Sequence, residues 1–118
     1  MNLKSQQLEI CHRFGSKPCF PNEDNIIGVA MSSLHLSEPL HGIRHPIVDK
    51  TSGWYIWRGD YKNDEDFFAP LHHSHLSEYC EEALPYLALL PGWRFLVKDE
   101  YQDVWFDENL TKKDALKS

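Results

Sequence analysis

Apolar residues in the middle of the chain predict two strands. Residues 26–32, Ile-Ile-Gly-Val-Ala-Met-Ser, form a short apolar run after a segment that contains prolines, which is typical of a strand. Gly28 and Ala30 share one face of this strand and are small enough to let another element approach closely. Residues 53–58, Gly-Trp-Tyr-Ile-Trp-Arg, are dense in aromatic residues that favour strands, and we expect this second strand to be central in the sheet.

Two segments have the spacing of a helix. Residues 2–14 allow a first helix, with Asn2 as its N-cap and Gly15 placed to end it. A clearer three-then-four spacing predicts the main helix, over about residues 73–84, packed on the sheet. Its apolar stripe consists of His72, His75, Leu76, Tyr79, Cys80, Ala83, Leu84 and Leu87. Pro85 must break or restart this helix, because proline lacks a backbone donor and disfavours helical geometry in the residue before it.

Two segments outside the predicted strands and helices have sequence features that indicate local structure. We expect residues 33–51, which contain Pro39, Gly42 and Pro46, to form a long connection that is functional or partly ordered. Residues 64–68, Asp-Glu-Asp-Phe-Phe, predict a short helical turn whose acids complement the helix dipole.

Residues 93–107 predict a hairpin whose register follows from its side chains. A four-residue loop at 99–102 sets opposite charges across from each other on one face and apolar residues across from each other on the other. The pairs in this register are Lys98 with Asp103, Leu96 with Trp105, Arg94 with Asp107, Val97 with Val104, and Phe95 with Phe106. We expect the face formed by the last two pairs to lie against the core.

These elements predict an α+β fold, a small two-layer domain with a mostly antiparallel sheet of three to five strands. Its parts are the C-terminal hairpin (about 93–107) and the main helix (about 73–84). The 118 residues suit one domain, 1–118, with a polar tail at 111–118, and they exclude a two-domain enzyme.

The net charge of the chain limits the classes of partner that we expect it to bind. A net charge of -6 argues against nucleic acid and anionic membranes as partners. The acids concentrate in residues 60–118, which carry thirteen acidic and six basic residues. Such a half-chain is able to steer a basic partner toward the protein, and it is also explained by a solvated surface that keeps the protein soluble.

Cysteines and apolar runs indicate the compartment. Cys11, Cys19 and Cys80 match no zinc or redox motif, so reduced thiols are the simplest interpretation. The first residues lack the apolar run of a signal peptide, and residues 83–90 are too short to span a bilayer. We therefore expect a cytoplasmic protein without a cofactor.

Catalytic and metal chemistry finds little support in the sequence. His72 and His75 share a helix face and are weak candidates for zinc ligands, but the sequence does not dictate the other ligands that zinc needs. Cys80 belongs to the apolar stripe and is expected to be a buried hydrophobe, not a nucleophile. The acids of residues 60–66 are explained by a solvated turn.

The tryptophans have two interpretations, as residues of the hydrophobic core or as the lining of a binding site. The chain has four tryptophans, and the two in residues 53–58 point to opposite faces of their strand. We expect a covered arrangement in which Arg44 or His45 lies over a tryptophan in a cation–π contact. The alternative is a pocket for an anionic small molecule, in a binding domain or an enzyme. That pocket would consist of Arg44, His45, Trp54, Trp57 and Trp105.

Several sequence blocks resemble one known family. The blocks are Gly42-Ile43-Arg44-His45-Pro46, Ser52-Gly53-Trp54-Tyr55-Ile56-Trp57, Asp66-Phe67-Phe68 with Pro70-Leu71-His72, Glu78-Tyr79-Cys80, Pro91-Gly92-Trp93-Arg94-Phe95-Leu96 and Asp103-Val104-Trp105-Phe106-Asp107. Their order and spacing, over roughly Cys11 to Leu110, resemble the immunity protein thirty-three family of bacterial polymorphic toxin systems. This resemblance implies a cytoplasmic protein that binds and neutralises a cognate protein toxin, and it implies no catalytic residue.

The charge pattern and the resemblance lead to one hypothesis for the binding face. We expect an acidic and aromatic surface to meet a toxin of basic character. The residues of this hypothesis are Arg44, His45, Trp57, Arg58, Asp60, Asp64, Glu65 and Asp66. The competing classes are the small-ligand pocket described above and a structural or sensing interaction domain.

Overall fold

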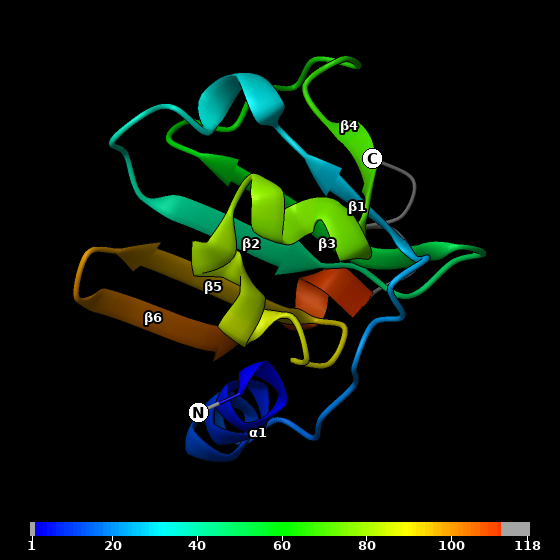
Figure 1. Cartoon of the computed structure of the whole chain (residues 1–118), viewed down its shortest axis with the longest axis vertical. Helices are drawn as coiled ribbons and strands as arrows, with labels where there is room; N and C mark the ends of the chain where they lie inside the picture. The colour runs from blue at the N-terminus through cyan, green and yellow to red at the C-terminus, as the bar shows by residue number, and fades with distance from the viewer. Residues whose placement is uncertain (1, 112–118) are drawn as a thin grey trace.

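A six-stranded sheet, in the order β4-β1-β3-β2-β5-β6, runs through the molecule (Figure 1). The computed structural model describes residues 2–111. The strands are β1 (Ile26–Val29), β2 (Leu40–Arg44), β3 (Thr51–Arg58), β4 (Ala69–His72), β5 (Trp93–Lys98) and β6 (Tyr101–Phe106). The helices are α1 (Leu3–Phe14) and four short 3₁₀ helices, η1 (Met31–Ser33), η2 (His73–Glu78), η3 (Glu81–Tyr86) and η4 (Glu108–Thr111).

The α+β class is confirmed, but the predicted sheet was too small. The sheet is mixed, because β1 and β3 run parallel while the other neighbours are antiparallel. The expected strand 53–58 is β3, and it is central as predicted. The connection 33–51 proved to contain β2, which pairs with both β3 and β5. Strand β4 was not predicted, because it contains Pro70. It is an edge strand of the sheet, where a proline is tolerated.

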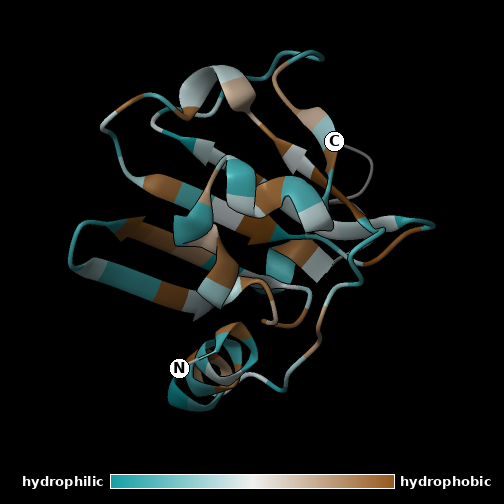
Figure 2. Ribbon diagram, in the orientation of Figure 1, coloured by the Kyte–Doolittle hydropathy of each residue, from teal (hydrophilic) through white to brown (hydrophobic). Residues whose placement is uncertain are grey.

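The core lies on one face of the sheet, which we call the first face. Helix α1 and the η2–η3 segment cover this face (Figure 1), and the apolar positions of the strands point toward them. Figure 2 shows the apolar residues gathered in the strands and on the side of α1 that faces the sheet. The largest buried side chains here include Trp54, Phe95, Ile27, Leu40 and Ile56. Each such side chain stabilises the fold by roughly 1.5–3 kcal/mol relative to an exposed position.

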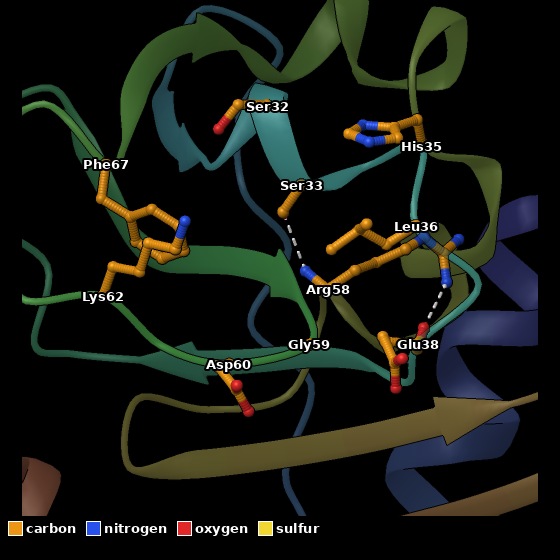
Figure 3. A pocket seen from close by; sticks show the side chains of 10 residues that line it. All are labelled: Ser32, Ser33, His35, Leu36, Glu38, Arg58, Gly59, Asp60, Lys62 and Phe67. Atoms are coloured by element: carbon orange, nitrogen blue, oxygen red, sulfur yellow. Dashed lines mark hydrogen bonds between the residues drawn. The ribbon is translucent and has the colours of Figure 1, made fainter.

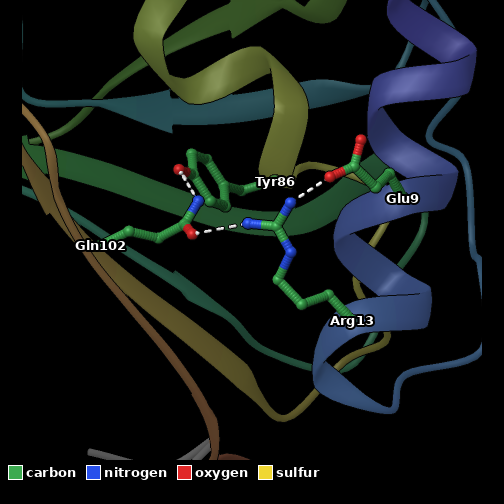
Figure 4. A network of polar contacts seen from close by, with 4 residues as sticks. All are labelled: Glu9, Arg13, Tyr86 and Gln102. Carbon is green, nitrogen blue, oxygen red and sulfur yellow. Dashed lines mark hydrogen bonds and ion pairs between the residues drawn. The ribbon is translucent and has the colours of Figure 1, made fainter.

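Helix α1 begins and ends as the sequence predicts. The Ser5 backbone N–H donates to Asn2 Oδ1 at 2.8 Å, and Gly15 ends the helix in the left-handed region. Arg13 pairs with Glu9 and donates to Gln102 of β6 (Figure 4). These contacts tie the first helix to the last strand.

The predicted helix over residues 73–84 was wrong, because the segment forms two 3₁₀ helices, η2 and η3. The chain leaves helical geometry at Cys80 (φ −155°, ψ 78°), and Pro85 has no N–H to extend a regular helix. Leu76, Cys80 and Ala83 are nevertheless buried in the core, as the apolar stripe predicts. Residues 64–68 form the short turn that the sequence predicts, closed by the bond from Phe67 N–H to the Asp64 carbonyl at 3.0 Å.

The hairpin over residues 93–107 exists, but its predicted register is shifted by two residues. Lys98 pairs with Tyr101, which leaves a two-residue loop in which Asp99 has φ 52°. Two-residue loops with positive φ match the twist of the strands, and aspartate tolerates this conformation. A shift of two keeps every side chain on its predicted face, so Phe95, Val97 and Val104 are buried. Phe106, expected in the core, is exposed.

Candidate functional site

One end of the sheet gathers most of the unbalanced charge of the chain. Here β2 and β6 begin and β3 and β5 end, because Leu40 pairs with both Arg58 and Val97, and Lys98 pairs with Tyr101. The nine acidic side chains at this end are Glu38, Asp60, Asp64, Glu65, Asp66, Glu81, Glu82, Asp99 and Glu100, and all are exposed. The three basic ones are Arg58, Lys62 and Lys98. We call this surface the acidic end; its net charge of -6 equals that of the whole chain.

Arg58 holds the loops of the acidic end together. Its guanidinium pairs with the carboxylate of Glu82 and donates to the Glu38 carbonyl at 3.4 Å. Its backbone N–H donates to Ser33 Oγ at 3.0 Å (Figure 3). The side chain is only 12% exposed, so Arg58 organises the surface from beneath more than it presents a free charge.

A hollow lies between the 32–38 and 58–67 segments at the acidic end. Its volume is about 450 Å³, and Asp60, Lys62 and Phe67 line one side of it while His35 and Leu36 line the other (Figure 3). A second hollow of about 290 Å³ is also lined by Leu36 and Arg58, so the two are adjacent. Both are open and carry charges of both signs, unlike the enclosed apolar pockets that hold small molecules.

Aromatic residues cover the other face of the sheet, the second face, beside the acidic end. Trp57 is 4% exposed and stacks on His41, with ring centroids 5.1 Å apart. Phe68 and Tyr61 approach Trp57 edge-on from the loop that follows β3. Trp57 is therefore unavailable to a partner, which corrects its place in the predicted binding face, whereas Tyr61 is 56% exposed.

Arg44 lies in the core and does not belong to a binding surface. It is 1% exposed, and its guanidinium donates to the carbonyls of Ser52, Cys19, Leu87 and Leu89 at 2.6–3.3 Å. The same group lies 5.6 Å from the ring centroid of Trp54, which confirms the expected cation–π contact. Burial lowers the pKa of the Arg44 guanidinium, although arginine remains protonated. The prediction that Arg44 contacts a partner is therefore corrected.

His45 is half-buried and lies edge-on to Tyr55, with ring centroids 5.6 Å apart. Burial lowers the pKa of its imidazole, which favours the neutral form. Its Nδ1 atom is buried and has no hydrogen-bond partner in the part of the chain that the structure describes. His45 and Arg44 lie at the opposite end of β2 from the acidic end.

The alternative small-molecule pocket does not form from its five residues. Trp54 points to the first face with Arg44, whereas Trp57 points to the second face. Trp105 lies on β6, where the guanidinium of Arg94 is 5.4 Å from its ring centroid. These side chains therefore do not converge on one space.

The histidines reveal a buried pair that the sequence did not indicate. His73 Nε2 is 2.6 Å from Ser52 Oγ, and burial lowers the pKa of His73 to about 4. Ser52 is fully buried, so its hydroxyl is closed to a substrate, whereas His73 is half-buried and lines a hollow of about 290 Å³ with Gln7 and Phe20. Nothing in the sequence distinguishes His73 from its exposed neighbours, because its partner lies 21 residues away.

The weak metal candidates remain exposed. His72 and His75 have ring centroids 6.4 Å apart, and His75 pairs with Glu78 at 3.0 Å. Within residues 2–111, no three histidine, cysteine or acidic side chains are grouped so that they could hold a metal ion. Burial raises the pKa of the Cys80 thiol, which disfavours a nucleophilic thiolate.

Comparisons with known proteins agree with the resemblance seen in the sequence. Residues 6–107, from within α1 to just beyond β6, match the model of the Imm33-like domain. No curated protein and no solved structure matches the chain. In residues 2–111, no helix is long and apolar enough to cross a membrane. Because the match covers most of its length, the chain belongs to the Imm33-like domain family.

Proposed function

We propose that this protein is an immunity protein that neutralises a cognate protein toxin by binding it through the acidic end. The family implies a toxin as the partner in general. The observation that carries the placement is the gathering of nine exposed carboxylates, against three basic side chains, at one end of the sheet. Binding, not catalysis, is the proposed mode of action, since the Ser52 hydroxyl is fully buried and the tryptophans do not form a pocket.

Concentrated charge of one sign suits an inhibitor that must capture its target quickly. Such a surface attracts a basic partner over a distance of about 10 Å at 0.1 M salt and raises association rates by roughly 10–1000-fold. Arg58 supports this role because it ties the connection between β1 and β2 and the start of η3 to the end of β3. Tyr61 and Leu36, both exposed, add apolar contact area within the same surface. Three free cysteines, Cys11, Cys19 and Cys80, suit action in the reducing cytoplasm.

Charge reversal tests this proposal. The triple variant Asp60→Lys, Asp64→Lys, Asp66→Lys changes exposed residues, so the fold should persist. Its association rate constant should fall at least tenfold at low salt, and the difference should shrink as the salt concentration rises. The probe is a purified toxin domain, identified by sequencing the genes that neighbour the gene for this chain. Association is measured by surface binding, and protection by growth of bacteria that express both proteins.

The matched control changes the same charge elsewhere. The variant Glu23→Lys, Asp24→Lys, Glu108→Lys has the same net charge as the first variant, but its exposed sites lie away from the acidic end. It should lose much less association rate. Equal losses of association rate in the two variants would show that total charge, and not the acidic end, governs association. Unchanged binding by the first variant would refute the acidic end as the contact surface.

A further inference from the structure

The last strand, β6, is an edge of the sheet, and within residues 2–111 no other strand pairs with its outer side (Figure 1). Natural edge strands are usually short, or carry proline, lysine or a bulge, because their free backbone groups otherwise pair with another chain. The opposite edge strand, β4, follows this rule, since it has four residues and contains Pro70. Strand β6 has six residues, no proline or lysine, and an unbroken register against β5.

Three residues of β6 direct their backbone groups away from the sheet. Asp107 N–H donates to the Gly92 carbonyl at 2.7 Å, and bonded positions alternate along an antiparallel pair, so the odd-numbered residues of β6 also face β5. Gln102, Val104 and Phe106 therefore point their N–H and C=O groups outward. In the described part of the chain, these groups bond to no other segment.

Strand β6 is held in place by its side chains on the first face. Gln102 Nε2 donates to the Tyr86 hydroxyl at 2.6 Å, and Gln102 Oε1 accepts a bond from Arg13 of α1 at 3.2 Å (Figure 4). The side chain of Val104 is buried in the core. A strand that is already fixed loses little conformational freedom when another strand pairs with it.

The outward groups of β6 are self-complementary. A two-fold axis at Val104 places this residue opposite Val104 of a second copy, and it places Gln102 opposite Phe106 of that copy. In this antiparallel arrangement each outward N–H meets an outward C=O, so six hydrogen bonds form, one for each of the three N–H groups in two copies. A parallel arrangement would bring the two acidic ends side by side, whereas the antiparallel one places them at opposite ends of the pair.

Side chains on the second face complement this pairing. Asp103 lies opposite Trp105 of the second copy, and the guanidinium of Arg94 lies 5.4 Å from the centroid of its own Trp105 ring. The Cα atoms of Asp103 and of Arg94 in the second copy are then two strand spacings apart, roughly 10 Å, which the two side chains span together. Arg94 also pairs with Asp107 of its own chain, but its side chain is still 31% exposed. The symmetry provides this contact of opposite charges twice.

We infer that the outer edge of β6 is a homodimer interface, in which two copies of the chain pair their β6 strands antiparallel and join two six-stranded sheets into one. This inference does not depend on the proposed function, because it uses only a second copy of the chain. A contact made by one strand from each copy is smaller than the roughly 1,200 Å² of a stable interface. The monomer and the dimer should therefore exchange, in proportions that depend on protein concentration.

The oligomeric state of the full-length protein tests this inference. Sedimentation velocity over a range of protein concentrations should show the mass rising from one chain toward two. Amide exchange followed by NMR should show the N–H groups of Gln102, Val104 and Phe106 protected only at the high concentrations. The N–H groups of Asp103 and Trp105 should be protected at every concentration, because they bond to β5.

A charge reversal on β6 locates the interface. Asp103→Lys changes an exposed side chain, so the fold should persist, but it puts a lysine on the edge and turns both contacts with Arg94 into repulsions. The dissociation constant of the dimer should rise about tenfold or more. Glu65→Lys makes the same change of charge at an exposed position in the loop between β3 and β4, so this control should dimerise like the wild type. Thermal unfolding should show that both variants fold.

A protein that stays monomeric at every concentration would overturn the inference. A dimer would also overturn it if the three outward N–H groups exchanged as fast as in the monomer, or if Glu65→Lys weakened the dimer as much as Asp103→Lys. If these N–H groups became protected only when a purified toxin domain binds, the occupant of the edge would be a strand of the toxin and not a second copy. The proposed function would stand in each case.

Discussion

Replacing Arg44 by methionine should strongly destabilise the protein. Arg44 is a buried charge whose hydrogen bonds join β2 to the neighbouring strand β3 and to two distant segments. In the described residues, the carbonyls of Cys19 and Leu89 accept no other hydrogen bond, whereas the Leu87 carbonyl also accepts one from Trp54. Two buried acceptors left without a donor cost about 2–6 kcal/mol, and the cation–π contact adds about 0.5–2 kcal/mol.

Removing the charge also removes the penalty of burying it, so the net loss should be about 3 kcal/mol or more. That loss is a large part of the 5–15 kcal/mol stability typical of a domain. Urea unfolding, followed by the fluorescence of the four tryptophans, two of which are buried, measures it. Arg44→Lys should also destabilise the protein, because an ammonium group retains the charge but does not span the same carbonyls.

Arg94→Met is the matched control. Arg94 also lies over a tryptophan and pairs with Asp107 at 3.1 Å, but it is partly exposed, so its removal should cost about 1 kcal/mol or less. If Arg44→Met lost no more stability than Arg94→Met, the role of Arg44 as a core cross-link would be refuted.

Two further predictions concern buried groups. Burial holds the pKa of His73 near 4, below the value of about 6.5 in an unfolded chain, so its stabilising contribution is complete above pH 6.5 and is lost as the pH falls toward 4. The free energy of unfolding should drop by up to about 3 kcal/mol over this range, and His73→Asn should remove that part of the pH dependence. Urea unfolding of the wild type and of His73→Asn at pH 7, 5.5 and 4 measures this difference. An equal loss of stability in the two proteins would contradict the prediction. Gly42→Ala should destabilise the fold by about 1–3 kcal/mol, because the added Cβ would lie 2.1 Å from a ring carbon of Phe95 in the core. Thermal unfolding would count against this packing argument if the variant matched the wild type.

The sequence predicted elements with strong local signals and missed those that depend on neighbours. Helix α1 has its cap and its glycine within the segment itself, and β3 has a continuous aromatic run. The short β2, flanked by prolines, is recognisable only from the strands on either side of it. The same reasoning explains the register error, because the loop at Asp99 and not the side-chain pairs sets the alignment of β5 and β6.

In the candidate site, too, features with a local cause could be predicted and features that depend on distant residues could not. Acidic residues of the 60–66 turn are exposed, as expected of charged side chains outside regular elements. The burial of Arg44 could not be predicted, because two of its acceptors, Cys19 and Leu89, lie 25 and 45 residues away in sequence. The odd spacing of three residues that places Trp54 and Trp57 on opposite faces was visible in the sequence, and it already contained the reason that the alternative pocket does not form.

The contacts of α1 have a consequence for how the chain folds. Gln7 donates to the Leu84 carbonyl at 2.9 Å, and Arg13 reaches Gln102, so the first helix docks on segments 77 and 89 residues further along. An isolated helix of twelve residues is barely stable in water. Helix α1 therefore becomes stable only when the segments that it contacts, in the last third of the chain, have folded. Chains dominated by such distant pairings fold in about milliseconds to seconds, and we expect α1 to be protected from amide exchange only after β5 and β6 have joined the sheet.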